Sequence, residues 1–275
     1  MERIRDAIQK ARRAREGEPV FEEEQPESRR RGTPARPDLE ESWLAIPQFE
    51  PDHKHFRKNR IITLICEDPA YTSFDIMRTK LLATMKQKGW RSLAITSPNP
   101  HCGKTMVSAN LAFSFARQKE IRSVLIDIDL RRPQLAKTLG LKPGPSVASF
   151  LSGFGEITSQ FVRFDKNLAI GASTNAQKHS AELLSNSQTR KSIDTLCDQL
   201  QPDIIIYDMP PLLASDDTLA FLPNVDCTLL VVEAEKTTIQ EVDETEQTLA
   251  EKSNLLGVVL NKCRFGSENY GYYYD

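Results

Sequence analysis

Residues 93–105, LAITSPNPHCGKT, decide how this chain folds, because a short apolar run is followed at once by a Gly-Lys-Thr triplet and a helical pattern. At such a strand-to-helix turn, backbone N–H groups and the helix N-terminus form a cradle for phosphate groups. Lys104 is then expected to reach the outer phosphates of a nucleotide, and Thr105 to offer its hydroxyl to Mg²⁺. The usual pattern has a glycine five residues before Gly103, where this chain has Pro98. The position of the triplet between strand and helix therefore carries the interpretation.

Outward from this turn, short apolar runs alternate with helical patterns. We expect strands at 93–96, 124–126, 168–170, 204–207, 228–232 and 256–260, and helices at 71–87, 105–118, 181–200 and 239–252. Strands that are apolar throughout and separated by helices favour a parallel sheet covered on both faces. The sequence therefore predicts an α/β fold, a doubly wound and mostly parallel sheet of the P-loop NTPase type. Ligands of such sheets bind at the carboxyl ends of the strands.

Carboxylates follow two of the other expected strands. Asp127 and Asp129 come directly after residues 124–126, and side chains two residues apart share a face if the extended geometry persists. Asp208 follows the apolar run 204–207, an arrangement that holds Mg²⁺ in P-loop proteins. One carboxylate can serve the metal while another takes a proton from an attacking hydroxyl. Each acid could instead cap a turn, but three such elements at three strand ends favour a nucleotide site.

The first 58 residues differ in composition from the rest, with 13 Lys/Arg, 13 Asp/Glu and six of the 16 prolines. Such a segment buries too little apolar surface to offset its ordering entropy, so we expect it to be largely disordered. The apolar island 43–46 (WLAI) could pack against the domain. A short helix, either solvated or docking on a membrane surface or a partner, is expected where apolar residues recur at helical spacing: Ile4, Ala7, Ile8, Ala11 and Ala14.

Charge and composition exclude several classes of protein. The chain carries 36 Lys+Arg against 38 Asp+Glu, so it has no overall basic surface for nucleic acid. No run of about 18 apolar residues is present, and the charged opening MERIRDAIQK lacks the apolar core of a secretory signal. The five cysteines have no paired spacing of a metal site or disulfide framework. We therefore expect a cytoplasmic protein.

The last ten residues, 266–275, form a tyrosine-rich tail after a domain expected at 59–265. Four of the six tyrosines of the chain lie in the last six residues, and the flanking residues are too polar and flexible for a packed segment. Exposed hydroxyl groups of this kind suit phosphate acceptors: Tyr270, Tyr272, Tyr273 and Tyr274.

From Phe74 to the C-terminus, the sequence resembles the bacterial protein-tyrosine autokinases of capsular and exopolysaccharide synthesis. The most specific match is three apolar residues followed by Asp127-x-Asp129-x-Arg131. The motif DMPP at 208–211 and the tyrosine cluster after GVVLNK at 257–262 also match. The opening MERIRDAIQKARR is similar to the N-terminal segment of soluble members that work beside a separate membrane adaptor.

The resemblance implies ATP and Mg²⁺ as cofactors and a role for each matching residue. Asp127 would be the base toward tyrosine, with Lys104, Asp129 and Arg131 completing the catalytic group. Thr105, Asp129 and Asp208 would arrange the metal. The residues that would bind the nucleotide are those of the loop together with Asn261, which corresponds to the position that contacts adenine in relatives: Pro100, His101, Cys102, Gly103, Lys104, Thr105, Met106 and Asn261.

The sequence departs from the family pattern at two places. His101-Cys102 stands where members usually have Gly-Glu, although His is among the residues that do adopt a positive φ. The subunit-contact helix of the family reads Glu-x-x-Arg-x-x-Arg, whereas this chain has Thr72, Asp75 and Arg78 at those positions. Self-association is therefore expected to be weaker than in relatives.

These observations predict an Mg-ATP-dependent tyrosine autokinase that phosphorylates its own tail and regulates exopolysaccharide or capsule synthesis and export. Two alternatives stay open: a non-kinase ATPase switch of the deviant-Walker type, which carries a lysine where this chain has Asn99, and a nucleotide-binding scaffold without turnover. The implied partners are a membrane polysaccharide co-polymerase adaptor and a phosphatase, with no nucleic acid. The implied location is the inner face of the membrane, through the adaptor.

Overall fold

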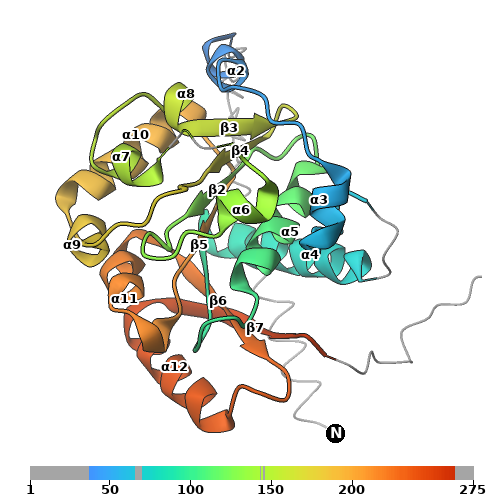
Figure 1. Ribbon diagram of the computed structural model, residues 1–275, viewed down its shortest axis with the longest axis vertical. Coiled ribbons are helices and arrows are strands. Elements are labelled where there is room, and N and C mark those ends of the chain that lie inside the picture. The colour runs from blue at the N-terminus through green and yellow to red at the C-terminus, as the bar shows by residue number, and fades with distance from the viewer. Residues whose placement is uncertain (1–36, 66–69, 143, 145, 264–275) are drawn as a thin grey trace, which may run out of the picture. The chain divides into compact units, whose positions relative to one another are not determined.

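The computed structural model describes residues 37–65, 70–142, 144 and 146–263 (Figure 1). Residues 1–36 and 37–275 form separate units, and the fold described below is that of the second. The helix expected over residues 4–14 and the four tail tyrosines lie outside the described residues. None of the helices within the described ranges is both long enough and apolar enough to cross a membrane.

The expected alternation of strands and helices is present. The strands are β1 Ser92–Thr96, β2 Ser123–Asp127, β3 Phe161–Phe164, β4 Leu168–Gly171, β5 Ile204–Asp208, β6 Cys227–Glu233 and β7 Asn254–Asn261. The helices are α2 Pro37–Leu44, α3 His53–Lys58, α4 Tyr71–Lys88, α5 Lys104–Ala116, α6 Leu135–Leu139, α7 Val147–Leu151, α8 Ile157–Gln160, α9 Ser180–Leu184, α10 Ser187–Leu200, α11 Asp217–Phe221 and α12 Ile239–Lys252. Short 3₁₀ turns occupy Leu212–Ala214 and Leu222–Asn224.

The seven strands form one sheet in the order β3-β4-β2-β5-β1-β6-β7. Every neighbouring pair is parallel except β3 with β4, which is antiparallel. The prediction of a doubly wound, mostly parallel sheet is therefore confirmed. The register places Asp127 of β2 beside Asp208 of β5, and Ile95 of β1 on the other side of Asp208. The two acidic strand ends and the strand before the phosphate-binding loop are thus neighbours.

Helices cover both faces of the sheet because successive strand residues point to opposite faces. Leu93 and Ile95 of β1 belong to the core under α3, α4, α5 and α6. Ala94 between them belongs to the opposite core, under α2, α7, α9, α10 and α11. Figure 1 shows these two groups of helices on either side of the sheet. Helix α12 packs against the end of the sheet formed by β6 and β7.

The start of the folded unit differs from the boundary expected at residue 58. Residues 37–58 form α2 and α3, and they bury Trp43, Ile46 and Phe56 in the two cores. Residues 47–49 also run beside β3, where Arg163 N–H donates to the Pro47 carbonyl and Phe49 N–H to the Arg163 carbonyl. The segment therefore shields an edge of the sheet that would otherwise expose unpaired backbone groups. The apolar island does pack against the domain, and the folded unit begins at Pro37.

Two further differences lie between residues 161 and 200. The single helix expected at 181–200 is two helices, α9 and α10, because Asn186 leaves the helical conformation and its side chain accepts a hydrogen bond from Gln188 N–H as the N-cap of α10. Strand β3 was not expected. It is a four-residue edge strand that contains Arg163, and such short mixed segments give little periodic signal.

The role of residues 37–58 in the core predicts a large effect of mutation at Trp43. Trp43 is 1% exposed, and its indole N–H donates to the Leu200 carbonyl at 2.8 Å. We expect Trp43→Ala to lower the free energy of unfolding by about 3–5 kcal/mol, the usual cost of deleting a buried aromatic side chain. Leu44→Ala, at a side chain that is 48% exposed, should cost about 0.5 kcal/mol or less. Urea denaturation measures both, and equal effects would contradict the assignment of this segment to the core.

Candidate active site

The phosphate-binding loop connects β1 to α5 and contains two residues with positive φ. Gly103, at φ +96, is the N-cap of α5, and a Cβ atom there would collide with the side-chain amide of Asn261. His101 adopts φ +68, so the structure confirms that histidine enters the left-handed region at this turn. Helix α5 begins at Lys104, directly after the loop, so its free N-terminal N–H groups lie beside the loop. This is the arrangement that binds phosphate.

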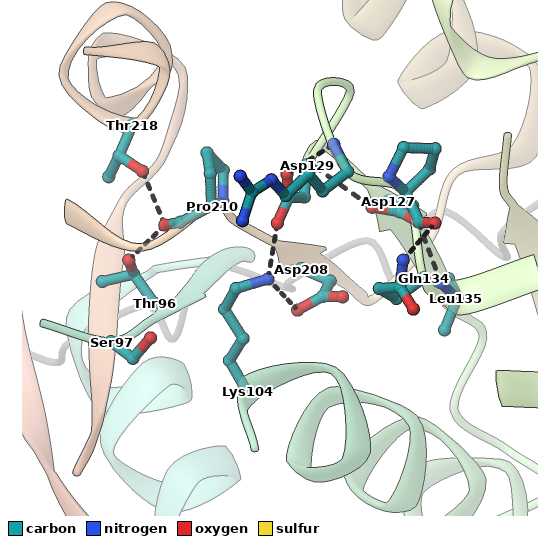
Figure 2. Close-up of polar contacts among 12 residues, drawn as sticks. Thr96, Ser97, Lys104, Asp127, Asp129, Gln134, Leu135, Asp208, Pro210 and Thr218 are labelled. Atoms are coloured by element: carbon teal, nitrogen blue, oxygen red, sulfur yellow. Dashed lines mark hydrogen bonds and ion pairs between the residues drawn. The ribbon is translucent and has the colours of Figure 1, made fainter. Parts of the chain in front are cut away.

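The Lys104 ammonium lies between two carboxylates of neighbouring strand ends (Figure 2). Its Nζ is 2.9 Å from Asp129 Oδ2 and 4.0 Å from Asp208 Oδ1. All three side chains are buried. Burial alone would lower the pKa of Lys104, but the charges of Asp208 and Asp129 outweigh it and raise that pKa. The environment of Lys104 therefore favours its charged form.

Asp127 accepts hydrogen bonds from two backbone groups at the end of β2. Its Oδ1 accepts from Asp129 N–H at 3.1 Å and its Oδ2 from Leu135 N–H at 3.0 Å. The side chain has no exposed surface. Burial, followed by the neighbouring charge of Asp208, raises the pKa of Asp127 well above its ordinary value. The environment of Asp127 thus favours its protonated form.

Asp208 has one oxygen with a partner and one without. Ser108 Oγ donates to Asp208 Oδ1 at 3.3 Å, whereas the buried Oδ2 has no hydrogen-bond partner among the described residues. Burial raises the pKa of Asp208, and the nearby Lys104 charge opposes that shift. A buried carboxylate oxygen without a donor is costly unless a ligand completes its environment.

The residues present fit a magnesium ion brought in with a nucleotide. With Asp127, Asp129 and Asp208 ionised and Lys104 charged, the site carries a net charge of −2, and Asp208 Oδ2 is a free oxygen ligand. Within the described ranges, no group of three His, Cys, Asp or Glu side chains is placed to hold a metal ion by itself. Mg²⁺ in nucleotide sites usually takes one or two carboxylates and completes its shell with phosphate oxygens and water. Asp129, Asp208 and the hydroxyl of Thr105 are the residues that would hold it.

The segment that follows β5 is fixed by two hydroxyl groups. Thr96 Oγ1 and Thr218 Oγ1 donate to the Pro210 carbonyl at 2.7 and 2.8 Å (Figure 2). Pro210 and Pro211 then form a wall of the cavity in front of the loop. The two prolines restrict the backbone and hold this wall in place.

A cavity of about 800 Å³ lies in front of the loop, large enough for a nucleotide. Eight of the expected site residues line it: Pro100, His101, Gly103, Lys104, Thr105, Met106, Asp129 and Arg131. Cys102 and Asn261 lie behind the loop, and Asp127 and Asp208 are buried beneath it. Six other polar residues of the cavity wall were not among the expected site residues, because they come from helices, helix ends and loops that are far apart in the sequence: Asn59, Arg132, Gln134, Thr138, Ser215 and Lys262.

Arg131, expected in the catalytic group, forms ion pairs and hydrogen bonds with residues of α9 and of the start of α11. Its guanidinium contacts Asp217 and Asp216, at 3.0 and 2.9 Å, and donates to Ser180 Oγ. Ser180 Oγ in turn donates to Asp217 at 2.6 Å. Arg131 therefore fixes α9 and α11 to the loop after β2, and lines the cavity from that position.

The buried charges predict how stability depends on pH. Because folding raises the pKa of Asp208, protonation of this group stabilises the fold; the contribution is complete at acidic pH and is lost as pH rises through the raised pKa. Asp208→Asn keeps the shape and puts its N–H₂ group at the oxygen that has no partner. We expect the variant without ligand to melt at a higher temperature than the original protein at pH 7, with the difference shrinking toward pH 4.

Asp216→Asn is the matched control for this prediction, because Asp216 is exposed and also pairs with an arginine. It should change the melting temperature little at either pH. A difference between Asp208→Asn and the original protein that does not depend on pH would contradict the electrostatic explanation.

Comparison with known proteins identifies the domain. Residues 93–270 match the family model described as the CobQ/CobB/MinD/ParA nucleotide binding domain. The tyrosine-protein kinase YwqD of Bacillus subtilis is 30% identical over 223 residues, covering 79% of this chain and 92% of YwqD. The putative tyrosine-protein kinase EpsB of Ralstonia nicotianae is 31% identical over 209 residues, which is 75% of this chain and 27% of EpsB. The chain thus spans about a quarter of the length of EpsB.

A comparison with solved structures gives the same family as the sequence comparison. The kinase domain of the Escherichia coli tyrosine kinase ETK superimposes with a TM-score of 0.68 and 28% identity, covering 78% of this chain and 84% of that domain. The resemblance drawn from the motifs is therefore confirmed. The chain belongs to the CobQ/CobB/MinD/ParA family of nucleotide-binding domains and, within it, to the bacterial tyrosine-protein kinases.

Proposed function

We propose that this protein is an Mg-ATP-dependent tyrosine autokinase that phosphorylates its C-terminal tyrosine cluster and thereby regulates exopolysaccharide or capsule synthesis and export. The observation that carries the proposal is the charge group formed by Lys104, Asp129 and Asp208 beside a phosphate-binding loop, with Asp127 next to it. The membership of the chain in the tyrosine-kinase family supports it.

The loop and its neighbours would bind and orient the nucleotide. Backbone N–H groups of the loop and the N-terminus of α5 face the phosphates, and Lys104 moves from its carboxylate partners to the outer phosphate oxygens. Asp129, Asp208 and Thr105 would hold a magnesium ion, which would supply positive charge beside the transferred phosphoryl group. The chemistry then depends on positioning, which the fixed strand ends supply.

Asp127 and Asp129 are proposed to have different roles, base and metal ligand, because their environments differ. Asp127 has the raised pKa of a group that accepts a proton, which suits a base toward the tyrosine hydroxyl. Asp129 is the carboxylate that lines the cavity and contacts Lys104, which suits a metal ligand. Asp127 is buried beneath the cavity, so the site must open for a tyrosine hydroxyl to reach its carboxylate.

The proposed acceptors are Tyr270, Tyr272, Tyr273 and Tyr274. The segment that carries them follows β7, and β7 ends at the same edge of the sheet as the phosphate-binding loop. Lys262, one residue beyond β7, lines the cavity. The last described residues before the tail therefore lie close to the proposed active site.

Self-association is proposed to be weaker than in relatives because the contact helix neutralises its own charges. Asp75 Oδ1 accepts from Arg78 and from Ser114 at 3.0 and 2.7 Å, and Asp75 Oδ2 accepts from Arg117 at 2.8 Å. Arg78 also donates to the Ser114 carbonyl. The arginine retained from the family motif is thus directed toward α5 and its own helix.

The structure favours the kinase over a deviant-Walker ATPase switch at one position. Where such switches carry an additional lysine, Asn99 donates to Glu241 Oε1 at 2.6 Å, and Glu241 belongs to the capping box of α12. Asn99 thus ties the loop to α12 and brings no positive charge to the phosphates. A scaffold that binds nucleotide without turnover is separated from the kinase by the assay below.

Phosphotyrosine formation by the purified full-length protein with Mg-ATP tests the proposal. Asp127→Asn should lower its rate by about 10²-fold or more while nucleotide affinity is retained, the scale expected for loss of a positioned base. Asp129→Asn should instead raise the Mg²⁺ concentration needed for half-maximal rate. Replacing all four tail tyrosines by Phe should abolish incorporation and leave nucleotide affinity unchanged.

Thermal unfolding of each variant accompanies the assay, because the Asn at position 127 faces two N–H donors with only one acceptor oxygen. ATP hydrolysis without phosphotyrosine in the original protein would support the ATPase switch. Binding without either reaction would support the scaffold.

The partners are proposed to be a membrane-anchored polysaccharide co-polymerase adaptor and a phosphatase, with the protein located in the cytoplasm and peripheral to the inner membrane face. Residues 1–36 form a unit separate from the domain and are the surface proposed to contact the adaptor or the lipid.

Removal of residues 1–36 tests the membrane proposal, because the cut at Pro37 leaves α2 and α3 in place. We expect the truncated chain to lose at least tenfold in the fraction that sediments with membranes containing the adaptor, while its melting temperature and nucleotide affinity stay the same. Equal sedimentation of the truncated and full-length chains would remove this segment from the proposal.

A further inference from the structure

We infer that Lys262, together with Asn261, is a positioning residue that holds the phosphate-binding loop in its ligand-ready conformation by binding the carbonyl groups of His101 and Cys102. The inference depends on nucleotide binding by the loop and is independent of whether the phosphoryl group is transferred to tyrosine. It differs from the adenine contact expected for Asn261, since the Asn261 side chain lies behind the loop.

A loop that turns its N–H groups toward an anion must turn its carbonyl groups away from it, and those carbonyls then need donors. In this chain side chains provide them for three loop residues. Ser97 Oγ donates to the Asn99 carbonyl at 2.7 Å, Lys262 Nζ to the His101 carbonyl at 2.7 Å, and Asn261 Nδ2 to the Cys102 carbonyl at 2.8 Å. Two of the three donors are consecutive residues at the end of β7.

The hydrogen bond from Lys262 is made to the residue with the unfavourable backbone conformation. His101 is a non-glycine residue at φ +68, a conformation that is unfavourable for residues with a Cβ atom. Glycine would adopt the same turn without that cost. A charged donor on the His101 carbonyl stabilises the turned peptide, so Lys262 compensates for the histidine at this position.

A buried carboxylate fixes the position of Lys262. Glu233, at the end of β6, contacts Lys262 Nζ at 3.1 Å and Lys236 Nζ at 2.6 Å. Ala234 N–H donates to the Asn261 carbonyl, which ties the end of β6 to the end of β7. The contacts of Lys236 and then Lys262 lower the pKa of Glu233, so the carboxylate stays ionised.

The two lysines on Glu233 form a natural matched pair. Both contact the same carboxylate, but only Lys262 has a hydrogen bond to the loop and lines the cavity. The Lys236 side chain is 73% exposed, against 44% for Lys262. Neutralising Lys236 therefore changes the charge next to Glu233 without removing a contact to the loop.

Two measurements on the full-length protein test the inference: the Kd for a non-hydrolysable Mg-ATP analogue, and hydrogen exchange of the amides of residues 98–106 in the empty protein. Lys262→Met should raise the Kd for the analogue by about tenfold, the scale expected for loss of a charge-assisted hydrogen bond. It should also speed up hydrogen exchange in the loop. Lys236→Met should change the Kd by less than about twofold and leave exchange unchanged. Lys262→Arg, which can donate to the same carbonyl, should recover most of the affinity.

A second background tests the link to His101. In His101→Gly the turn is no longer strained, so adding Lys262→Met should cost about threefold or less in affinity. The inference is overturned if Lys262→Met behaves like Lys236→Met in both measurements, or if its penalty is the same in the His101→Gly background. Because neither measurement reads phosphotyrosine, these outcomes do not depend on the proposed kinase activity.

Discussion

One buried ion group organises the candidate active site: the ammonium of Lys104 lies between the carboxylates of Asp129 and Asp208. Charges of this kind are costly to bury unless their geometry is fixed. The sheet order fixes it, because β2, β5 and β1 are adjacent and the register puts Asp127, Asp208 and Ile95 side by side. Burial raises the pKa values of Asp127 and Asp208, and for Asp127 the neighbouring charge of Asp208 adds to that effect. A bound cation would offset this cost, so we expect ligand binding to stabilise the fold.

Polar side chains on α5 connect this site to the outer parts of the domain. Asn110, buried in the middle of α5, accepts from the N–H groups of Ile62 and Thr63 and donates to the carbonyls of Arg60 and Met106. It therefore binds the segment after α3 to the helix that starts at the phosphate-binding loop. Asn59, at the end of α3, lines the cavity as a consequence. Residues 37–58 thus contribute to the core, and α3 at their end places Asn59 at the cavity.

Sequence patterns predicted the structure correctly wherever the pattern lay within one strand, loop or helix. The run before Gly103, the apolar strands and the acids after them predicted the sheet, the loop and the side chains Lys104, Asp129 and Asp208, because parallel strands bring their carboxyl ends to one edge. Composition was misleading at residues 37–58, where charged residues surround a few apolar ones. There Trp43 and Phe56 are buried because the domain supplies the apolar surface that the segment lacks. The break at Asn186 and the short strand β3 were likewise decided by packing and by edge pairing.

The sequence by itself determined that this chain forms a nucleotide-binding α/β domain with the motifs of a bacterial tyrosine kinase, since each motif is a short run with its own chemistry. Only the tertiary structure decided how the departures from those motifs are accommodated. His101 takes the left-handed turn with its carbonyl held by Lys262, and Asp75 pairs with Arg78 and with Arg117 of another segment. These partners are separated from the motif residues by up to 161 positions along the chain. No local pattern reports such contacts, because their energies depend on distances that exist only once the sheet has formed.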